Sequence, residues 1–334
     1  MNLSFSFIIP VFNRPNEIEE LLSSMSLLQF DDSFEIVIVE DGSEQDAKAV
    51  VEKYKNILNI SYYYKKNSGP GDSRNYGMQR AKGNYFLILD SDVILPSNYL
   101  AEVYAFLKNN YVHCFGGPDD AHDSFSDLQK AISYSMTSYL TTGGIRGRKN
   151  NLNKFQPRSF NMGLSKEAFL ASNGFGDIHP GEDPDLAIRL WKQGYQTALI
   201  PKAKVFHKRR ISWRKFYQQV LKFGLVRPIL NSWHPETAKI TYWFPSVFML
   251  ALISACVFAL IGYWQFIALF GLYILVLFLG GTIKYGSIGI GIKVIIAVLV
   301  QFYGYGRGFL KSNYYIHLLK RDPKQQFPKL FFKK

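Results

Sequence analysis

The feature that most constrains this chain is a change of character near residue 240. Before it, apolar and polar residues alternate as in a water-soluble domain, whereas residues 243–262 and 264–283 contain no Asp, Glu, Lys or Arg. Each stretch is close to the roughly 20 residues that a helix needs to cross a bilayer. Aromatic residues typical of membrane interfaces mark their edges: Tyr242, Trp243, Tyr263, Trp264 and Tyr285. The chain therefore predicts a soluble domain followed by a membrane region.

A third apolar stretch, at about 288–306, has two interpretations. It carries Lys293, Gln301 and several glycines, so it either spans the membrane or lies at its interface. Basic residues concentrate in 202–227 and again after Lys311, and such clusters prefer the cytoplasmic side. Two full spans keep both clusters on one side, and three do not. We therefore expect two spans in a tight hairpin and a third helix in the plane of the interface; burial of these segments as core helices is the alternative.

These patterns divide the chain into four parts: an α/β domain at 1–210, a juxtamembrane helix and linker at 211–240, a membrane region at 241–310 and a basic tail at 311–334. In 211–230, aromatic and aliphatic residues recur at helical spacing, with Arg214, Lys215 and Lys222 between them. This pattern predicts an amphipathic helix in the headgroup region. An ordinary helix packed on the first domain is the alternative, and the two are compatible.

The net charge of +13 and the pI of about 9.5 indicate an anionic partner. Because the basic clusters flank the apolar region, they fit anionic lipid better than nucleic acid, and we expect no nucleic-acid partner. The two cysteines, Cys114 and Cys256, are far apart and form neither a disulfide framework nor a metal motif, which agrees with a reducing compartment. The chain starts almost directly with a strand, so we expect no signal peptide. We expect a multi-pass protein of the inner (cytoplasmic) membrane whose first domain faces the cytoplasm.

Three apolar runs in the first domain predict buried strands: the run that opens residues 5–15 and ends at a proline and a polar turn, then 34–39 and 85–89. Each ends in polar residues, which are Asn13-Arg14, Glu40-Asp41-Gly42-Ser43 and Asp90-Ser91-Asp92. A glycine-rich turn within 67–77 leads into a helix that carries Arg74. In an open α/β sheet, ligands bind at the carboxyl ends of the strands. We expect the binding site of this domain at that edge.

Two carboxylates as close as Asp90 and Asp92 repel each other unless a cation lies between them. Mg²⁺ or Mn²⁺ on a diphosphate would supply that charge, since these ions take oxygen ligands from carboxylates and phosphates. Arg74 could bridge a diphosphate or hydrogen-bond a base. A strand followed by an ordinary polar turn is the alternative.

Six motifs in register resemble glycosyltransferase family 2: I-I-P-V-F-N-R, V-E-D-G-S, G-P-G-D-S-R-N-Y-G, L-D-S-D, N-M-G and G-E-D-P-D-L. The resemblance covers roughly residues 3–210. It implies a GT-A fold, which is a Rossmann-like mixed sheet flanked by helices, and inverting transfer from a nucleoside-diphosphate sugar, with UDP favoured. Glu40 stands where many relatives have a second Asp. The chain has Arg209-Arg210-Ile211-Ser212-Trp213 where processive synthases carry Q-x-x-R-W, which argues against a polymer-extruding synthase.

The resemblance also assigns catalytic and metal-binding roles. It points to Asp183 as the general base that deprotonates an acceptor hydroxyl, with Glu182 binding or orienting the acceptor. Acids at the start of a helix also satisfy free backbone N–H groups, and we give that structural role to Asp185. The predicted ligands of a divalent cation are Asp90, Asp92 and His207.

The remaining predicted site residues lie in these motifs, in the turn at 116–118 and in the basic run after His207. The predicted donor site comprises Pro10, Val11, Phe12, Asn13, Arg14, Asp41, Gly69, Arg74, Asn75, Asp90, Ser91, Arg209 and Arg210. Either of the last two could instead face lipid. The predicted acceptor and sugar pocket comprises Gly117, Asn161, Met162 and Gly163. Residues 119–157 read as a mobile loop with some helix, where acceptor specificity would reside.

The resulting hypothesis is a metal-dependent inverting glycosyltransferase that adds a sugar to a hydroxyl at the bilayer surface. The expected acceptor is a polyprenyl-diphosphate-linked saccharide in polysaccharide or glycan biosynthesis. One alternative is a polyprenyl-phosphate sugar transferase, whose ionised acceptor needs no base. Another is a nucleotide-sugar-binding membrane protein without turnover. The sequence leaves the sugar, the nucleotide and the oligomeric state open.

Overall fold

The computed structural model of the chain describes residues 3–120, 125–142, 154–207 and 212–332. They form two compact units. The sheet unit comprises Met1–His122, Arg148–Lys208 and Phe331–Lys334, and the helical unit comprises Asp123–Gly147 and Arg209–Leu330. The described part of 119–157 thus contributes helices to the second unit, although it lies between strands of the first in sequence.

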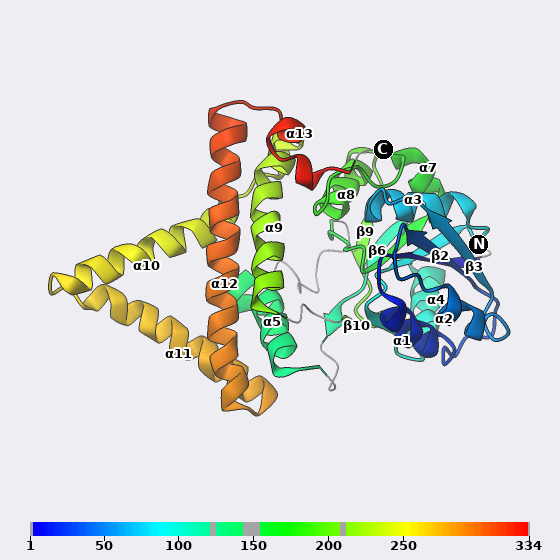
Figure 1. The fold of residues 1–334 in the computed structure, drawn as a ribbon, viewed down its shortest axis with the longest axis horizontal. Helices are drawn as coiled ribbons and strands as arrows, with labels where there is room; N and C mark the ends of the chain where they lie inside the picture. Colours follow the sequence, from blue (N-terminus) through cyan, green and yellow to red (C-terminus); the bar gives the residue numbers. More distant parts are fainter. Residues whose placement is uncertain (1–2, 121–124, 143–153, 208–211, 333–334) are drawn as a thin grey trace. The chain divides into compact units, whose positions relative to one another are not determined.

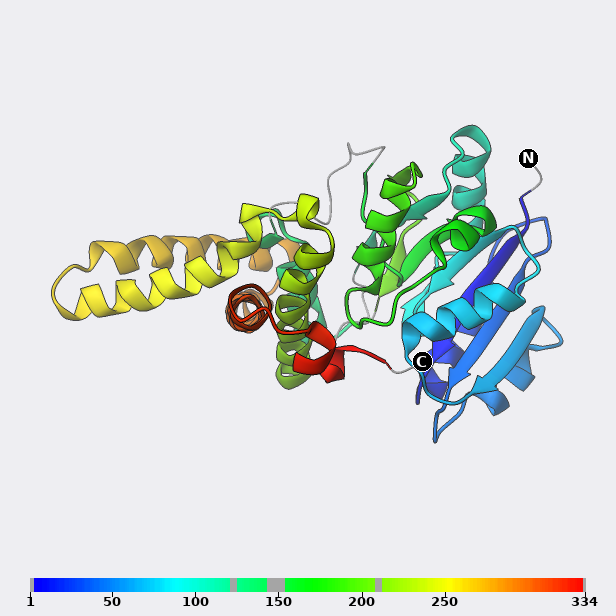
Figure 2. The same ribbon diagram turned by 90° about the horizontal axis from the view of Figure 1, so that it is seen from above.

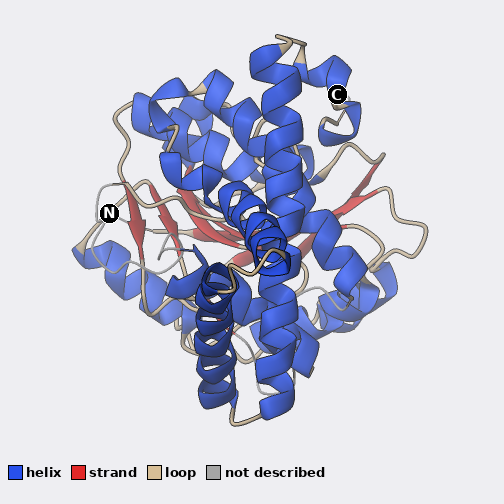
Figure 3. Cartoon of the chain, turned by 90° about the vertical axis from the view of Figure 1, so that its left-hand side faces the viewer, coloured by secondary structure: helices blue, strands red, loops and turns tan. Residues whose placement is uncertain are grey.

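The sheet unit is built on a mixed seven-stranded sheet with the order β3-β2-β1-β4-β8-β6-β9. Figure 3 draws the strands in red, with helices around them. Its strands are β1 (Phe5–Val11), β2 (Glu35–Asp41), β3 (Ile60–Lys65), β4 (Tyr85–Leu89), β6 (Cys114–Gly116), β8 (Asn161–Ser165) and β9 (Thr197–Leu199). The four strands from β3 to β4 are parallel, and β8 runs antiparallel to both β4 and β6. The parallel half brings the ends of β1, β2 and β4 to one edge.

Helices cover both faces of this sheet: α1 (Pro15–Met25), α2 (Lys48–Tyr54), α3 (Pro70–Arg80), α4 (Tyr99–Asn109), α7 (Lys166–Ser172) and α8 (Glu182–Lys192). In β1, Phe7 and Ile9 belong to one apolar core, and Ile8 belongs to the other. Burial on both faces explains why the strand reads as a continuous apolar run rather than an alternating one.

A small second sheet contains the residues that directly follow the acidic turn after β4. It has the order β5-β10-β7, with β5 (Val93–Ile94), β10 (Val205–His207) and β7 (Asp119–Asp120). His207 pairs with Val93 across β10 and β5. Because Val93 directly follows Asp92, this pairing brings a histidine distant in sequence beside the acidic turn.

The helical unit contains α5 (Asp127–Thr137), α6 (Tyr139–Thr142), α9 (Trp213–Trp233), α10 (Phe244–Leu260), α11 (Gln265–Tyr285), α12 (Ile288–Asn313) and α13 (Pro323–Gln326). Short 3-10 turns lie at Pro235–Thr237, Ile240–Trp243 and Pro328–Leu330, and one π-helical turn lies at Tyr314–Leu318. Among the described residues, three segments are long and apolar enough to cross a membrane: Ile240–Leu260, Gln265–Tyr285 and Ile288–Leu318. The first two form the predicted hairpin (Figure 2). The third, expected in the interface, also has the length of a span.

Helices α9 and α12 lie side by side within this unit (Figure 1). A Cβ atom on Gly224 of α9 would lie 2.1 Å from the Tyr305 carbonyl oxygen, and one on Gly308 of α12 would lie 2.3 Å from the Leu221 carbonyl oxygen. Only glycine allows the two backbones to approach so closely. A helix is thus present in the predicted region as α9, and one of its faces packs on α12. Its amphipathic placement in the headgroup region remains a prediction.

Candidate active site

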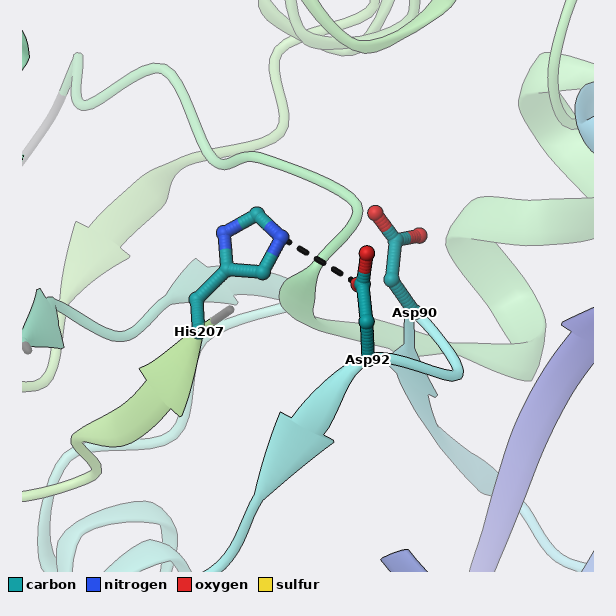
Figure 4. A group of neighbouring side chains, drawn as sticks. All are labelled: Asp90, Asp92 and His207. Atoms are coloured by element: carbon teal, nitrogen blue, oxygen red, sulfur yellow. Dashed lines mark ion pairs between the residues drawn. The ribbon is translucent and has the colours of Figure 1, made fainter. Parts of the chain in front are cut away.

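Asp90, Asp92 and His207 come together at the end of β4 (Figure 4). One possible ligand atom from each residue lies within 4.8 Å of the others. Asp92 Oδ1 is buried without a hydrogen-bond partner and lies 3.3 Å from His207 Nε2. Two carboxylates and one imidazole suit a divalent cation such as Mn²⁺. The three predicted metal ligands therefore fit such an ion by position and by chemistry.

The His207 ring is held from two sides. It stacks on Phe160, with 4.8 Å between the ring centroids and 19° between the planes. Its Nδ1 atom lies 3.9 Å from Asp119 Oδ2. Contacts of this kind fix the orientation of a ligating histidine.

Asp92 also forms an ion pair with Arg14, which follows strand β1. Arg14 Nη1 donates to Asp92 Oδ2 at 2.5 Å. Burial by itself would raise the pKa of Asp92, but His207 and Arg14 outweigh burial and hold that pKa well below its ordinary value. Asp92 is therefore ionised, as a metal ligand must be.

Arg74 connects the acidic turn to the start of α8. Its Nη2 donates to Asp90 Oδ1 at 2.7 Å, and its Nη1 donates to Glu182 Oε1 at 3.1 Å. The side chain is only 3% exposed. A buried arginine shared by two carboxylates places Asp90 and Glu182 in one site although 92 residues separate them in sequence.

The two acids at the start of α8 differ in their electrostatic surroundings. Glu182 Oε1 lies 2.8 Å from His179 Nδ1. Burial opposes ionisation of Glu182, but His179 and Arg74 outweigh it and lower its pKa to about 2. Burial, reinforced by the charge of Glu182, raises the pKa of Asp183 to about 6, against the attraction of Arg74 and Arg158. Paired carboxyl groups with diverging pKa values are typical of an acid–base site.

Asp183 has the features expected of a proton acceptor. Its Oδ1 is buried and has no hydrogen-bond partner. The next acid along α8, Asp185, instead accepts from Arg189 Nε at 2.8 Å. The pattern agrees with the different roles predicted for the two aspartates, and the catalytic role of Asp183 remains a prediction.

The predicted donor residues surround the ends of β1 and β2. Asp41 accepts from Lys65 Nζ at 2.7 Å and from the backbone N–H groups of Ser68 and Gly69, each at 2.9 Å. Its carboxylate therefore closes the turn before α3. Asn13 has a positive φ of 53°, and its side-chain oxygen accepts from the backbone of the loop after β2.

The other predicted donor residues vary in their accessibility. Pro10 and Val11 end β1, whereas Phe12 is 50% exposed and thus free to stack on a base. Ser91 is buried in the acidic turn. The Asn75 side chain binds the backbone of Phe175 through both its amide hydrogen and its oxygen. Their contacts with a donor remain predictions, and Arg209 and Arg210 lie outside the described residues.

The predicted acceptor residues lie in the interior of the sheet. Asn161 is fully buried, accepting from the Tyr99 hydroxyl at 2.7 Å and donating to the Ala203 carbonyl at 2.8 Å. Met162 is also buried. A Cβ atom on Gly117 would lie 1.9 Å from the Ala203 carbonyl oxygen, and one on Gly163 would lie 1.9 Å from the Phe115 ring. Their assignment to the acceptor pocket remains a prediction.

Four residues of this region were missed by the sequence reasoning: Lys65, Asp119, Phe160 and His179. Each contacts a predicted residue. For example, Lys65 donates to Asp41, and His179 hydrogen-bonds to Glu182. The position of His179, three residues before Glu182, was the only signal available for it.

The mixed sheet flanked by helices is typical of the GT-A fold, which confirms the predicted fold class. Residues 6–170 match the model of glycosyl transferase family 2. The match contains five of the six motifs and confirms the predicted resemblance for this part of the chain, whereas the sixth motif, at 181–186, lies beyond it.

Three similar proteins illustrate the match. A glycosyltransferase of Rickettsia bellii, described as uncharacterized, is 36% identical over 143 residues, which are 42% of this chain and 20% of that protein. The GalNAc(5)-diNAcBac-PP-undecaprenol beta-1,3-glucosyltransferase of Campylobacter jejuni is 27% identical over 229 residues, which are 66% of this chain and 67% of that protein. The mannosyltransferase PcManGT from Pyrobaculum calidifontis, solved with GDP-Man and Mn²⁺, has a TM-score of 0.62 at 16% identity and covers 91% of this chain and 88% of its own.

The match spans only about a fifth of the length of the first curated relatives, at 20% to 22%. The likeness to PcManGT concerns the fold alone.

Proposed function

We propose that this protein is a metal-dependent inverting glycosyltransferase. It moves a sugar from a nucleoside-diphosphate sugar, with UDP favoured, to a hydroxyl of a membrane-associated acceptor. The observation that carries this proposal is the Arg74 link, since it brings the Asp90–Asp92–His207 group and the Glu182–Asp183 pair into one site.

Asp183 is the general base of the proposed reaction. As the acceptor oxygen attacks the anomeric carbon, its proton passes to the Asp183 carboxylate, and the bond to the nucleoside diphosphate breaks on the opposite side of the sugar. A positioned base contributes about 10²–10⁴-fold to such a step. A pKa of about 6 leaves Asp183 mostly ionised at neutral pH while keeping it basic enough to accept the proton.

Asp90, Asp92 and His207 would hold the divalent cation. When bound, the cation neutralises the charge that develops on the departing diphosphate. Arg14 holds Asp92 from the other side, and Arg74 holds Asp90 while it keeps Glu182 ionised for the acceptor. These residues position the donor and the acceptor before the reaction begins.

The proposed acceptor is a polyprenyl-diphosphate-linked saccharide, with the sheet unit on the cytoplasmic side of the inner membrane. Three helices in the part of the chain that the structure describes have the length and composition of spans, which supports the membrane association. The name of the Campylobacter relative, which describes an undecaprenol-linked substrate, supports a lipid-linked acceptor. A raised pKa at Asp183 favours a hydroxyl over a lipid phosphate, because an already ionised phosphate needs no base.

The test uses the full chain in detergent, a panel of labelled UDP- and GDP-sugars, Mn²⁺ and lipid-linked acceptors. Asp183→Asn should lower kcat about 10²–10⁴-fold. Donor binding, measured as a thermal shift, should persist in this variant. Asp46→Asn, at an exposed loop position, is the matched control. Full activity of Asp183→Asn would exclude the proposed base, and transfer to polyprenyl phosphate alone would identify the other acceptor class.

A further inference from the structure

The last described residues of the chain return to the sheet unit. The helical unit ends at Leu330, and Phe331 and Phe332 belong with the catalytic strands and helices. Phe331 forms an antiparallel bridge with Ile178. The Phe332 N–H donates to the Asp177 carbonyl at 3.0 Å. These backbone contacts attach the segment to the loop Asp177–Gly181, which leads directly into α8.

The Phe332 ring contacts both sides of the proposed site. A Cβ atom on Gly69 would lie 2.3 Å from this ring, so the ring occupies space that only a glycine leaves free. On its other side, the ring lies 6.0 Å from the His179 ring, centroid to centroid. Gly69 also donates to Asp41, the residue predicted to contact the nucleotide. One aromatic side chain thus lies between the turn before α3 and the loop before α8.

The contacts of His179 continue from this ring toward the reacting groups. His179 Nδ1 lies 2.8 Å from Glu182 Oε1, and Glu182 in turn accepts from Arg74. Movement of the loop would therefore move the hydrogen-bond partner of Glu182 and the N-terminal turn that carries Asp183. A displacement of about 1 Å at such groups can lower a rate about 10²-fold.

We propose that Phe331 and Phe332 are positioning residues that clamp the Asp177–Gly181 loop and thereby hold Glu182 and Asp183 in place for transfer. This inference rests on the proposed function of the site. Phe332 acts through its packing on His179 and Gly69, and Phe331 acts through its bridge to Ile178.

Two truncations of the full chain test the clamp. A chain ending at Leu330 loses both phenylalanines, and a chain ending at Phe332 loses only Lys333 and Lys334, which makes it the matched control. We expect the shorter chain to show a kcat about 10- to 100-fold lower, with donor KM changed much less. The control truncation should retain wild-type kcat. Equal kcat values for both truncations would overturn the proposal, as would a rise in kcat, since that identifies the segment as an inhibitory plug.

Single substitutions guard against general misfolding. Phe332→Ala should reproduce the loss of kcat at an unchanged melting temperature, and Phe332→Tyr, which keeps the ring, should restore it. A double variant with His179→Ala should lose little more than either single variant, because both act on one loop. Fully additive losses would show that Phe332 does not act through His179 and would overturn this route.

Hydrogen exchange separates failure of the clamp from failure of the proposed function. The Leu330 truncation should speed amide exchange across Asp177–Asp183 and leave the core strand β2 unchanged. If the wild-type chain transfers no sugar but this exchange effect appears, the proposed function fails and the clamp stands. If the wild-type chain transfers sugar and the truncation changes neither exchange nor kcat, only the clamp fails.

Discussion

The two units of this chain use apolar residues in opposite ways. In the sheet unit, Ile8 and Val37 are fully buried between helices and strands. In the helical unit, Leu250 is 55% exposed and Leu269 is 67% exposed. Only 11% of an apolar 18-residue stretch within Ile240–Leu260 is buried. Large apolar side chains exposed on successive turns are unsuited to water and suited to lipid. One chain therefore combines a unit whose apolar residues form its interior with a unit whose exposed apolar surface is suited to lipid.

The units also differ in how they treat charge. The sheet unit buries Arg74 against Asp90 and Glu182, so the ion pairs of this one arginine are largely shielded from solvent. In the helical unit, Lys293 and Asp127 form an ion pair in which both side chains are more than a third exposed. Buried charges are costly and are retained where they serve a site. Substitutions in the sheet unit should therefore change the reaction rate most. Substitutions in the helical unit should act mainly by disturbing its packing, and so change its stability.

The largest effect is expected at the metal-type group of the sheet unit. Asp92→Ala removes a carboxylate that is 12% exposed and faces both His207 and Arg14. Since a bound cation contributes several kcal/mol to such a step, we expect activity to fall about 10³-fold or more. The Mn²⁺-dependent thermal shift should vanish as well, whereas Asp31→Ala, at an exposed loop position, should change neither measurement. An unchanged Mn²⁺ response in Asp92→Ala would place the cation elsewhere.

A packing change should have the next largest effect, and it should be confined to the helical unit. Gly224→Leu forces a side chain against the backbone of α12, whereas a Cβ atom on Gly271 of α11 meets nothing within 4 Å. We expect Gly224→Leu to destabilise the helical unit by at least about 1–3 kcal/mol and Gly271→Leu to change its stability by less than about 0.5 kcal/mol. Thermal unfolding in detergent measures both variants.

The same pair of glycine variants tests how independent the two units are. Donor binding to the sheet unit should survive in Gly224→Leu, because the predicted donor residues from Pro10 to Ser91 belong to the sheet unit. Loss of donor binding together with the packing defect would show that the two units do not fold independently.

The pH dependence of the reaction is a smaller effect and belongs to the sheet unit. Asp183 must be ionised to accept a proton, and burial and Glu182 raise its pKa to about 6. We therefore expect kcat/KM to fall about tenfold per pH unit below about pH 6 and to level off above it. An acidic limb centred near pH 4 would show that the folded protein does not perturb Asp183.

The pH dependence of folding stability that arises from Asp183 has the opposite sign to that of activity. A carboxyl group whose pKa is raised in the folded state holds its proton more tightly there than in the unfolded chain. Folding stability from this group is therefore present below about pH 4 and is lost as the pH rises through about 6. Asp183→Asn should consequently raise the melting temperature at pH 7.5 while it lowers activity.

Much of the sheet unit was predictable from local sequence. Apolar runs ending in polar turns located β1, β2 and β4, and the parallel sheet brings their ends to one edge. The carboxylates after β4 and at the start of α8 were therefore found at their correct ends of secondary structure. These signals are local because strand ends and helix starts are set by neighbouring residues.

The contacts that complete the site were not predictable in the same way. Arg74 reaches Glu182 across 108 residues, and Phe332 reaches Asp177 from beyond the helical unit. No short-range pattern encodes such pairs, since they depend on how whole elements pack. The helices α5 and α6 were likewise hidden in a segment read as a loop with some helix, although the capping box of Ser126 and Gln129 marks the start of α5.

The smallest predicted effect concerns the placement of α12, whose first turns lie either at the membrane interface or within the bilayer. Lys293 lies in the second turn of this helix, and its Nζ donates to Asp127 of α5 at 2.7 Å. An exposed ion pair at an aqueous interface is worth at most about 1 kcal/mol, so Lys293→Gln should barely change stability if this end of α12 lies at the headgroups. The same pair within hydrocarbon would leave Asp127 as an unpaired charge after the substitution, and the loss would be several kcal/mol. Thermal unfolding of Lys293→Gln beside Lys284→Gln, an exposed lysine at the end of α11, therefore separates a helix that begins at the interface from one that carries its ion pair into the bilayer.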